Sequence, residues 1–128
     1  MITAITQGVK ISVETFYQAE YSNPQDEEFM FAYRISIENQ SDQIVQLTRR
    51  HWFIFDSIGE LKEVEGEGVV GQQPVLEPGQ VHQYISGCQL QSEMGKMYGY
   101  YEMQRLDDGS AFEVRIPEFV LFSGPKLN

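Results

Sequence analysis

The sequence has a single cysteine, few basic residues and no long apolar run. Cys88 has no second cysteine to pair with, so nothing points to an oxidising compartment. No window approaches the roughly 18 apolar residues of a membrane span, and the N-terminus lacks the basic start and apolar stretch of a signal peptide. These absences predict a cytoplasmic protein that does not enter a membrane.

Positive charge is also scarce, since 9 basic residues stand against 19 acidic ones and give a formal net charge of −10. A field of this sign repels nucleic acids and anionic lipids, so neither is expected as a partner. No nucleophile elbow or triad motif is present, and the spacing of His51, His82 and Cys88 matches no zinc pattern. We therefore predict a non-enzymatic protein without a cofactor, a catalytic residue or a metal site.

The apolar residues repeat with a period of two, which is typical of antiparallel strands with one buried face. Residues 9–17 and 29–38 show this alternation most clearly. Asp107-Asp108-Gly109 predicts a hairpin between strands at 97–106 and 111–121, and Pro78-Gly79 predicts a type II turn. About seven strands in 128 residues predict one all-β domain over residues 1–128, either a sandwich or a barrel.

The strand that begins near Gln43 changes its pattern along its length. Val45 and Leu47 are apolar at odd positions, whereas Trp52 and Ile54 are apolar at even positions. A β-bulge near residues 49–51 would explain the change. The alternative is a central strand that is covered on both faces.

The segment Gly66-Glu67-Gly68-Val69-Val70-Gly71 spells G-x-G-x-x-G, but no helix follows it. A dinucleotide-binding fingerprint needs that helix in a βαβ unit. Two interpretations remain. In the one we favour, Gly66, Gly68 and Gly71 turn the chain between strands; in the other, their backbone N–H groups bind an anion and Arg49 or Arg50 supplies the positive charge.

Two further patterns are candidates for binding. Glu63, Glu65 and Glu67 alternate along one strand, where they either attract a hard divalent cation or, as we favour, form a solvated edge that discourages strand addition. Tyr98 and Tyr100 share one strand face opposite Met97 and its apolar neighbours. Aromatic residues on both faces indicate a central strand or a contact patch for a protein partner.

Several segments together resemble the ApaG family over nearly the whole chain. They are F-x-Y-x-I-x-I-x-N at 31–39, V-Q-L at 45–47, R-H-W at 50–52, V-x-G-x-G-V-V-G-x-Q-P at 64–74, L-x-P-G at 76–79, G-x-M-x-G-x-Y-x-M at 95–103 and I-P-x-F at 116–119. Thr48 and Cys88 are small departures from the expected pattern.

The resemblance implies an immunoglobulin-like or fibronectin type III-like β-sandwich. It also links bacterial relatives to cobalt resistance and magnesium efflux, and it implies use as a protein-interaction module. A suggested pyrophosphate-binding role of the glycine motif would fall on Gly66, Gly68 and Gly71. We therefore expect a protein-interaction module, with a phosphate-, pyrophosphate- or nucleotide-binding domain as the alternative. The oligomeric state, monomer or homodimer, stays open.

Overall fold

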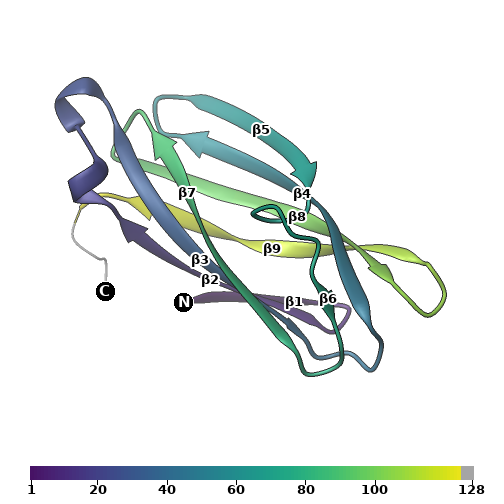
Figure 1. The fold of residues 1–128 in the computed structure, drawn as a ribbon. Coiled ribbons are helices and arrows are strands. Elements are labelled where there is room, and N and C mark those ends of the chain that lie inside the picture. The colour runs from purple at the N-terminus through teal and green to yellow at the C-terminus, as the bar shows by residue number, and fades with distance from the viewer. Residues whose placement is uncertain (125–128) are drawn as a thin grey trace.

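The chain forms two antiparallel β-sheets packed face to face, as shown by a computed structural model that describes residues 1–124 (Figure 1). The four-stranded sheet has the order β1 (Ile2–Thr6), β2 (Val9–Tyr17), β3 (Phe29–Asn39) and β7 (Val81–Leu90). The five-stranded sheet has the order β5 (Glu60–Glu67), β4 (Val45–Asp56), β8 (Met94–Arg105) and β9 (Ala111–Phe122), with β6 (Val75–Leu76) paired to β4. Two 3₁₀ turns, η1 (Ala19–Tyr21) and η2 (Pro24–Asp26), connect β2 to β3.

The predicted antiparallel sandwich is confirmed. The strands number nine in the described part of the chain, more than the seven or so expected, because β1 has five residues and β6 only two. Within residues 1–124 there is no helix of the length and apolar character that crossing a bilayer requires.

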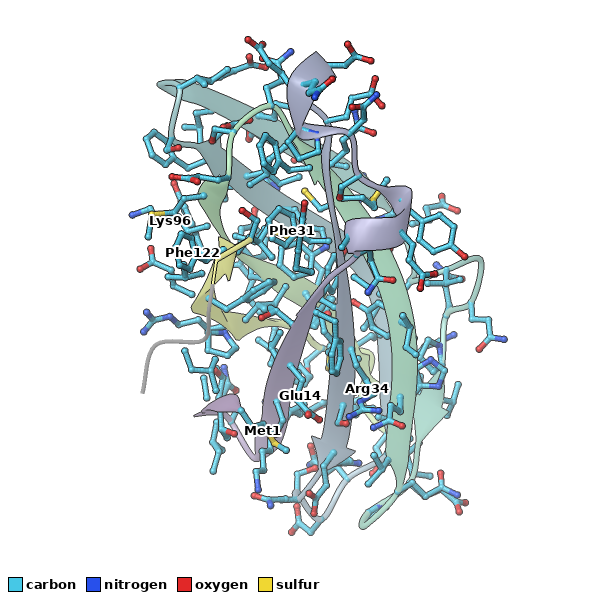
Figure 2. All side chains as sticks on the ribbon, turned by 90° about the vertical axis from the view of Figure 1, so that its left-hand side faces the viewer. Met1, Glu14, Phe31, Arg34, Lys96 and Phe122 are labelled. Atoms are coloured by element: carbon cyan, nitrogen blue, oxygen red, sulfur yellow. The ribbon has the colours of Figure 1, made fainter. Side chains whose placement is uncertain are left out.

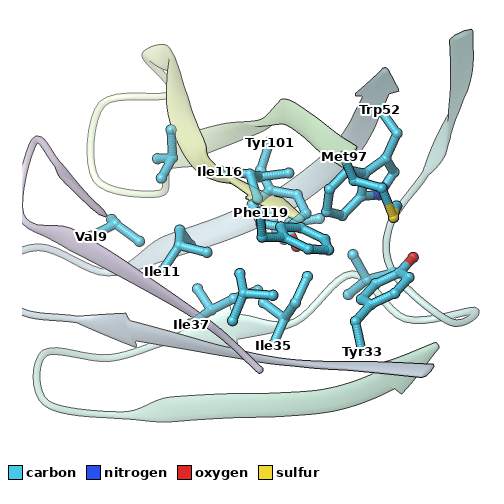
Figure 3. Close-up of a cluster of buried hydrophobic side chains, with 14 of the residues drawn as sticks. Val9, Ile11, Tyr33, Ile35, Ile37, Trp52, Met97, Tyr101, Ile116 and Phe119 are labelled. Carbon is cyan, nitrogen blue, oxygen red and sulfur yellow. The ribbon is translucent and has the colours of Figure 1, made fainter. Parts of the chain in front are cut away.

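The core lies between the sheets and is built by the period-two alternation. Side chains of β2 and β3 face those of β4, β8 and β9 across the interior (Figure 3). The labelled residues of this cluster are Val9, Ile11, Tyr33, Ile35, Ile37, Trp52, Met97, Tyr101, Ile116 and Phe119, each at most 5% exposed. The outer face of the four-stranded sheet is polar by contrast, and carries an ion pair of 2.7 Å between Arg34 Nη2 and Glu14 Oε1 (Figure 2).

Both predicted turns are present. Gln80 N donates to Glu77 O at 3.0 Å, and Gly79 has a φ of 87°, which a type II turn requires at its third position. At the β8–β9 hairpin, Arg105 N donates to Ser110 O at 2.8 Å and Gly109 has a φ of 72°.

The bulge in β4 lies at Thr48, just before the predicted 49–51 region. Leu47 pairs with Met103 and Arg49 pairs with Glu102, so Thr48 is the extra residue. Its hydroxyl donates to Glu102 O at 3.0 Å. After the bulge, even-numbered residues of β4 face the core and odd-numbered residues face outward, which accounts for the change of pattern.

The two lateral sides of the sandwich differ. On one side β9 lies against β1 and β2, where Arg115 N donates to Thr6 Oγ1 at 3.2 Å. On the other side the edges of β5 and β7 leave a cleft of about 420 Å³ between the sheets. Of the residues that the sequence singled out, Arg50 lies in the cleft, and Tyr98 and Tyr100 lie on the outer face of the five-stranded sheet.

Candidate functional site

The glycine segment forms a tight turn at the mouth of the cleft. Gly68 N donates to Thr48 O at 2.9 Å, and Val69 and Gln72 exchange two backbone hydrogen bonds of 2.8 and 3.0 Å. Val70 and Gly71, with φ of 47° and 75°, are the central residues of this turn. Two positive φ values in succession indicate a type I′ turn. Gly68, with a φ of 63°, and Gly71 thus fit the turn interpretation that the sequence favoured, whereas Gly66 does not, because it is paired within β5 and has no positive φ.

The loop presents carbonyl groups to Arg50. Arg50 Nη1 donates to Glu67 O at 2.9 Å and to Gly68 O at 3.0 Å. A Cβ at Gly66 would lie 2.8 Å from Arg50 Nη2, so a side chain there would displace the guanidinium from this position. The carbonyls of Glu67 and Gly68 therefore hold a cation of the chain itself, and Gly66 leaves room for it.

The predicted ligand residues are divided between two faces. Gly66 and Gly68 contact Arg50 at the cleft, whereas Gly71 lies at the exposed tip of the turn. Arg49 is on the opposite face of β4, where its Nε lies 3.6 Å from Glu102 Oε2. A phosphate site on this set of residues stays a prediction, and Arg49 cannot share a ligand with Arg50 across the sheet.

Three tyrosine hydroxyls lie within the electrostatic influence of the Arg50 guanidinium, and Tyr33 and Tyr84 line the cleft with it. Burial raises the pKa of Tyr33, Tyr84 and Tyr101, while the charge of Arg50 acts in the opposite direction on all three. Tyr84 and Tyr101 hydrogen-bond through their hydroxyls at 2.5 Å. Trp52, which is 3% exposed, lies beside these residues in the wall of the cleft.

The outer face of the five-stranded sheet carries a continuous set of aromatic rings. His51 stacks on Phe53 at a centroid distance of 4.8 Å and on Tyr100 at 4.9 Å, and Phe53 stacks on Tyr98 at 5.3 Å. We call these four residues the outer aromatic face. All four are half-buried, so the rings lie against the sheet and remain accessible from outside. Tyr98 and Tyr100 thus occupy the solvent-facing surface that the sequence predicted.

Carboxylates surround this aromatic face. His51 Nε2 lies 2.8 Å from Glu63 Oε1, and His51 Nδ1 lies 2.7 Å from Glu65 Oε1. The pKa of the Tyr100 hydroxyl is raised, first by desolvation and then by the negative charges of Glu113, Glu102, Glu65 and Glu63. The face is therefore aromatic at its centre, and its margin carries these carboxylates together with Arg49 and Lys96, which lie beside Glu102 and Glu118.

His51, Glu63 and Glu65 offer ligand atoms within 4.8 Å of one another, which is close enough to share a cation. Each carboxylate, however, faces a different nitrogen of the ring. A single ion would have to displace one of these contacts, because the two ring nitrogens point in different directions. The arrangement is better described as a histidine held between two acceptors.

The grouping of His51 with the glutamates was not predicted from the sequence. The spacing of His51 from His82 and Cys88 gives no sign of it, whereas the structure places His51 opposite Glu65 in the β4–β5 hairpin. A hairpin register centred on Ser57–Gly59 would have revealed the pairing. The expected role of Glu63, Glu65 and Glu67 as a charged edge agrees with the position of β5 at the end of its sheet.

Comparison with known proteins places this architecture in a family. The family model described as the ApaG domain matches residues 19–105. The chain belongs to the ApaG domain family. It is 47% identical to Protein ApaG of Paramagnetospirillum magneticum over 100% of both chains, and 46% identical to Protein ApaG of Brucella canis over 94% of this chain and 92% of the relative.

A solved structure from Bordetella pertussis, described as an ApaA protein, shows the same fold at 41% identity with a TM-score of 0.86. The match covers 89% of this chain and 92% of that one. A structure from Archaeoglobus fulgidus is similar in fold alone, at 9% identity and a TM-score of 0.50, over 90% of this chain and 98% of that one. The family model, the curated relatives and the Bordetella structure confirm the ApaG family resemblance that the sequence motifs indicated.

Proposed function

We propose that this ApaG-domain protein is a non-enzymatic interaction module that binds a basic segment of another protein on its outer aromatic face. The single observation that carries the proposal is the stacked set of His51, Phe53, Tyr98 and Tyr100 within a margin of carboxylates. Aromatic residues are enriched at the centres of protein interfaces, where they supply large contact areas at low entropic cost.

A contact within the chain supports a basic partner for this surface. Lys96 Nζ lies 5.9 Å from the ring centroids of both Phe55 and Tyr98, and 3.3 Å from Glu118 Oε1. An ammonium group is thus held over aromatic rings and beside a carboxylate, which is a favourable cation–π arrangement. A partner with Arg or Lys side chains would repeat this contact at Tyr100, and the net charge of −10 would attract it from a distance.

The proposed setting is the cytoplasm, because the cysteine is a free thiol. The link of bacterial relatives to cobalt resistance and magnesium efflux stays a prediction for this chain. The alternative in which the N–H groups of the glycine loop bind phosphate or pyrophosphate has less support, because Gly68 N–H is bonded to Thr48 O and the loop turns carbonyl groups, not N–H groups, toward Arg50.

The test uses two synthetic peptides of equal length, one rich in Arg and Lys and one in which Glu replaces these residues. Binding is followed by amide and side-chain NMR shifts. The basic peptide should shift the resonances of His51, Tyr98 and Tyr100. Its binding should weaken as the ionic strength rises, since screened charges contribute less. Equal binding of both peptides, or shifts confined to the four-stranded sheet, would refute the proposal.

Matched variants locate the surface. Tyr98→Ala and Tyr100→Ala should each weaken binding of the basic peptide by about tenfold, which corresponds to the loss of one interface anchor of about 1–2 kcal/mol. Phe16→Ala is the control, because Phe16 is 39% exposed and lies under the Arg34 guanidinium on the opposite sheet. Its binding should equal that of the unmodified protein.

A further inference from the structure

Arg50 is a half-buried cation without a carboxylate partner. It lies on the inner face of β4, and within residues 1–124 no carboxylate oxygen approaches its guanidinium within 4.0 Å. A charge removed from water is costly unless an opposite charge compensates it. The chain has 19 acidic residues, yet the two acceptors of Arg50 Nη1 are the neutral carbonyls of Glu67 and Gly68.

Gly66 keeps this arrangement possible, because a side chain there would push the guanidinium away. The carbonyls occupy one terminal nitrogen, and the remaining N–H groups stay available. Tyr33 and Tyr84 near Arg50 carry no compensating charge, because burial keeps their phenols protonated. The environment therefore holds a cation and leaves its charge open to the cleft.

The rest of the cleft is suited to an apolar group. Its volume of about 420 Å³ is within the range of small-molecule sites. Trp52 lines it beside Arg50 on the same face of β4, whereas Met97 and Leu90 line it further along, toward Asp56. Each of the three is at most 3% exposed, so they form a closely packed apolar wall. Val69 and Val70 of the glycine loop border the same space.

The acidic groups of the cleft lie at its other end. Asp56 is six residues from Arg50 along β4, which corresponds to about 20 Å in an extended strand. Its carboxylate accepts from Gln91 N at 2.7 Å and from Ser92 Oγ, so it is occupied by the protein. Glu60 lies 3.8 Å from Lys62 Nζ at the rim. An anion beside Arg50 is thus well separated from these charges.

We propose that this cleft is a binding site for a small organic anion. Its phosphate or carboxylate group pairs with Arg50, and its aromatic or aliphatic body packs against Trp52. The site lies between the sheets, on the opposite side of β4 from the outer aromatic face. The proposal is therefore independent of the proposed interaction function.

Trp52 is the sole tryptophan of the chain and reports directly on the cleft. The intact protein is titrated with phenyl phosphate, phenylacetate, phenol and inorganic pyrophosphate while Trp52 fluorescence and amide and Arg side-chain NMR shifts are recorded. Phenyl phosphate or phenylacetate should give a saturable binding curve. Phenol should bind at least about tenfold more weakly, because it lacks the charge-assisted contact. The acid that binds more tightly shows whether the cleft prefers a phosphate or a carboxylate group.

Two arginine variants on the same strand provide matched controls. Arg50→Gln should weaken binding of the preferred acid by about tenfold or more, and the affinity of Arg50→Lys should lie between those of Arg50→Gln and the unmodified protein. Arg49→Gln removes the same charge on the other face and should bind within about twofold of the unmodified protein, because water and salt screen charges across the sheet.

The outcomes are decisive even if Arg50→Gln fails to fold, because the unmodified protein distinguishes the acids from phenol. Equal binding of phenol and both acids would refute the proposal. Equal losses in the Arg49 and Arg50 variants would do so too, because they would indicate general attraction of anions. Pyrophosphate that binds best and shifts only the turn at 69–72 would place an anion outside the cleft and would also overturn it.

Discussion

Replacement of Gly68 by alanine should be the most damaging change in the glycine segment, and Gly71→Ala is its matched comparison. At Gly68 a Cβ would lie 2.2 Å from Gln72 O and 2.9 Å from the carbonyl carbon, both in the backbone. At Gly71 nothing lies within 4 Å of the added Cβ. Both glycines have a positive φ, 63° and 75°, so the conformational penalty is similar and the clash is the difference.

The magnitude follows from the bonds that the clash must disturb. Gly68→Ala forces the turn open, and three backbone hydrogen bonds are exposed to loss: Gly68 N to Thr48 O and the two between Val69 and Gln72. At about 1 kcal/mol each, together with about 1–2 kcal/mol for a left-handed alanine, the free energy of unfolding should fall by about 4–5 kcal/mol. Gly71→Ala keeps the bonds and should lose about 1–2 kcal/mol.

Urea denaturation followed by circular dichroism measures both values on the same scale. The slope should stay the same in the two variants, because neither alters the surface that unfolding exposes. A loss for Gly68→Ala no larger than that for Gly71→Ala would refute the reasoning. It would mean that the loop relaxes freely, as a flexible ligand loop would, and that its hydrogen bonds contribute little.

Three other changes test separate parts of the structure. Val70→Asn should raise the free energy of unfolding by about 1 kcal/mol in the same assay, because a β-branched residue at φ 47° is strained and this side chain is 62% exposed; no gain would show that the turn is unstrained. Asn39→Ala should lower the free energy of unfolding by about 2–4 kcal/mol, since the buried amide donates to Gln43 O and Leu76 O. A loss below about 1 kcal/mol would contradict that role. Burial raises the pKa of Cys88 from 9.0 to about 11, so its neutral thiol stabilises the fold below pH 9 and this contribution is lost as the pH rises through 11. At pH 8 a disulfide reagent should react about 100-fold more slowly with the folded protein than with the unfolded one, and equal rates would contradict the raised pKa.

The sequence was sufficient to predict the fold because the alternation in β2 and β3 and the turn residues near Gly79 and Gly109 are local signals. Each strand shows its buried face without reference to its neighbours. The short strands β1 and β6 were not predicted. β1 has only five residues, and β6 has two and depends on its pairing with β4. The bulge at Thr48 could be inferred only approximately, since the change of pattern does not specify which residue is extra.

The site was less accessible from the sequence because it depends on contacts between strands. The motif drew attention to the glycines, but the sequence could not show that their carbonyls bind Arg50. Arg49 and Arg50 looked equivalent as neighbours, whereas the pleat sends them to opposite faces. The stacking of His51 on Tyr100 likewise requires the β4–β8 register, which local patterns do not specify.

The alternation along β4 also makes the two proposals separable by experiment. Arg50 and Trp52 face the cleft, while His51 and Phe53 face outward, so each site uses side chains that the other does not. If the sheet is rigid, a Tyr98 variant should leave anion binding unchanged and an Arg50 variant should leave peptide binding unchanged. A reproducible effect of one ligand on the affinity of the other would reveal coupling through β4 itself. The bulge at Thr48, between the glycine loop and Glu102, is where such coupling would enter, because it contacts both.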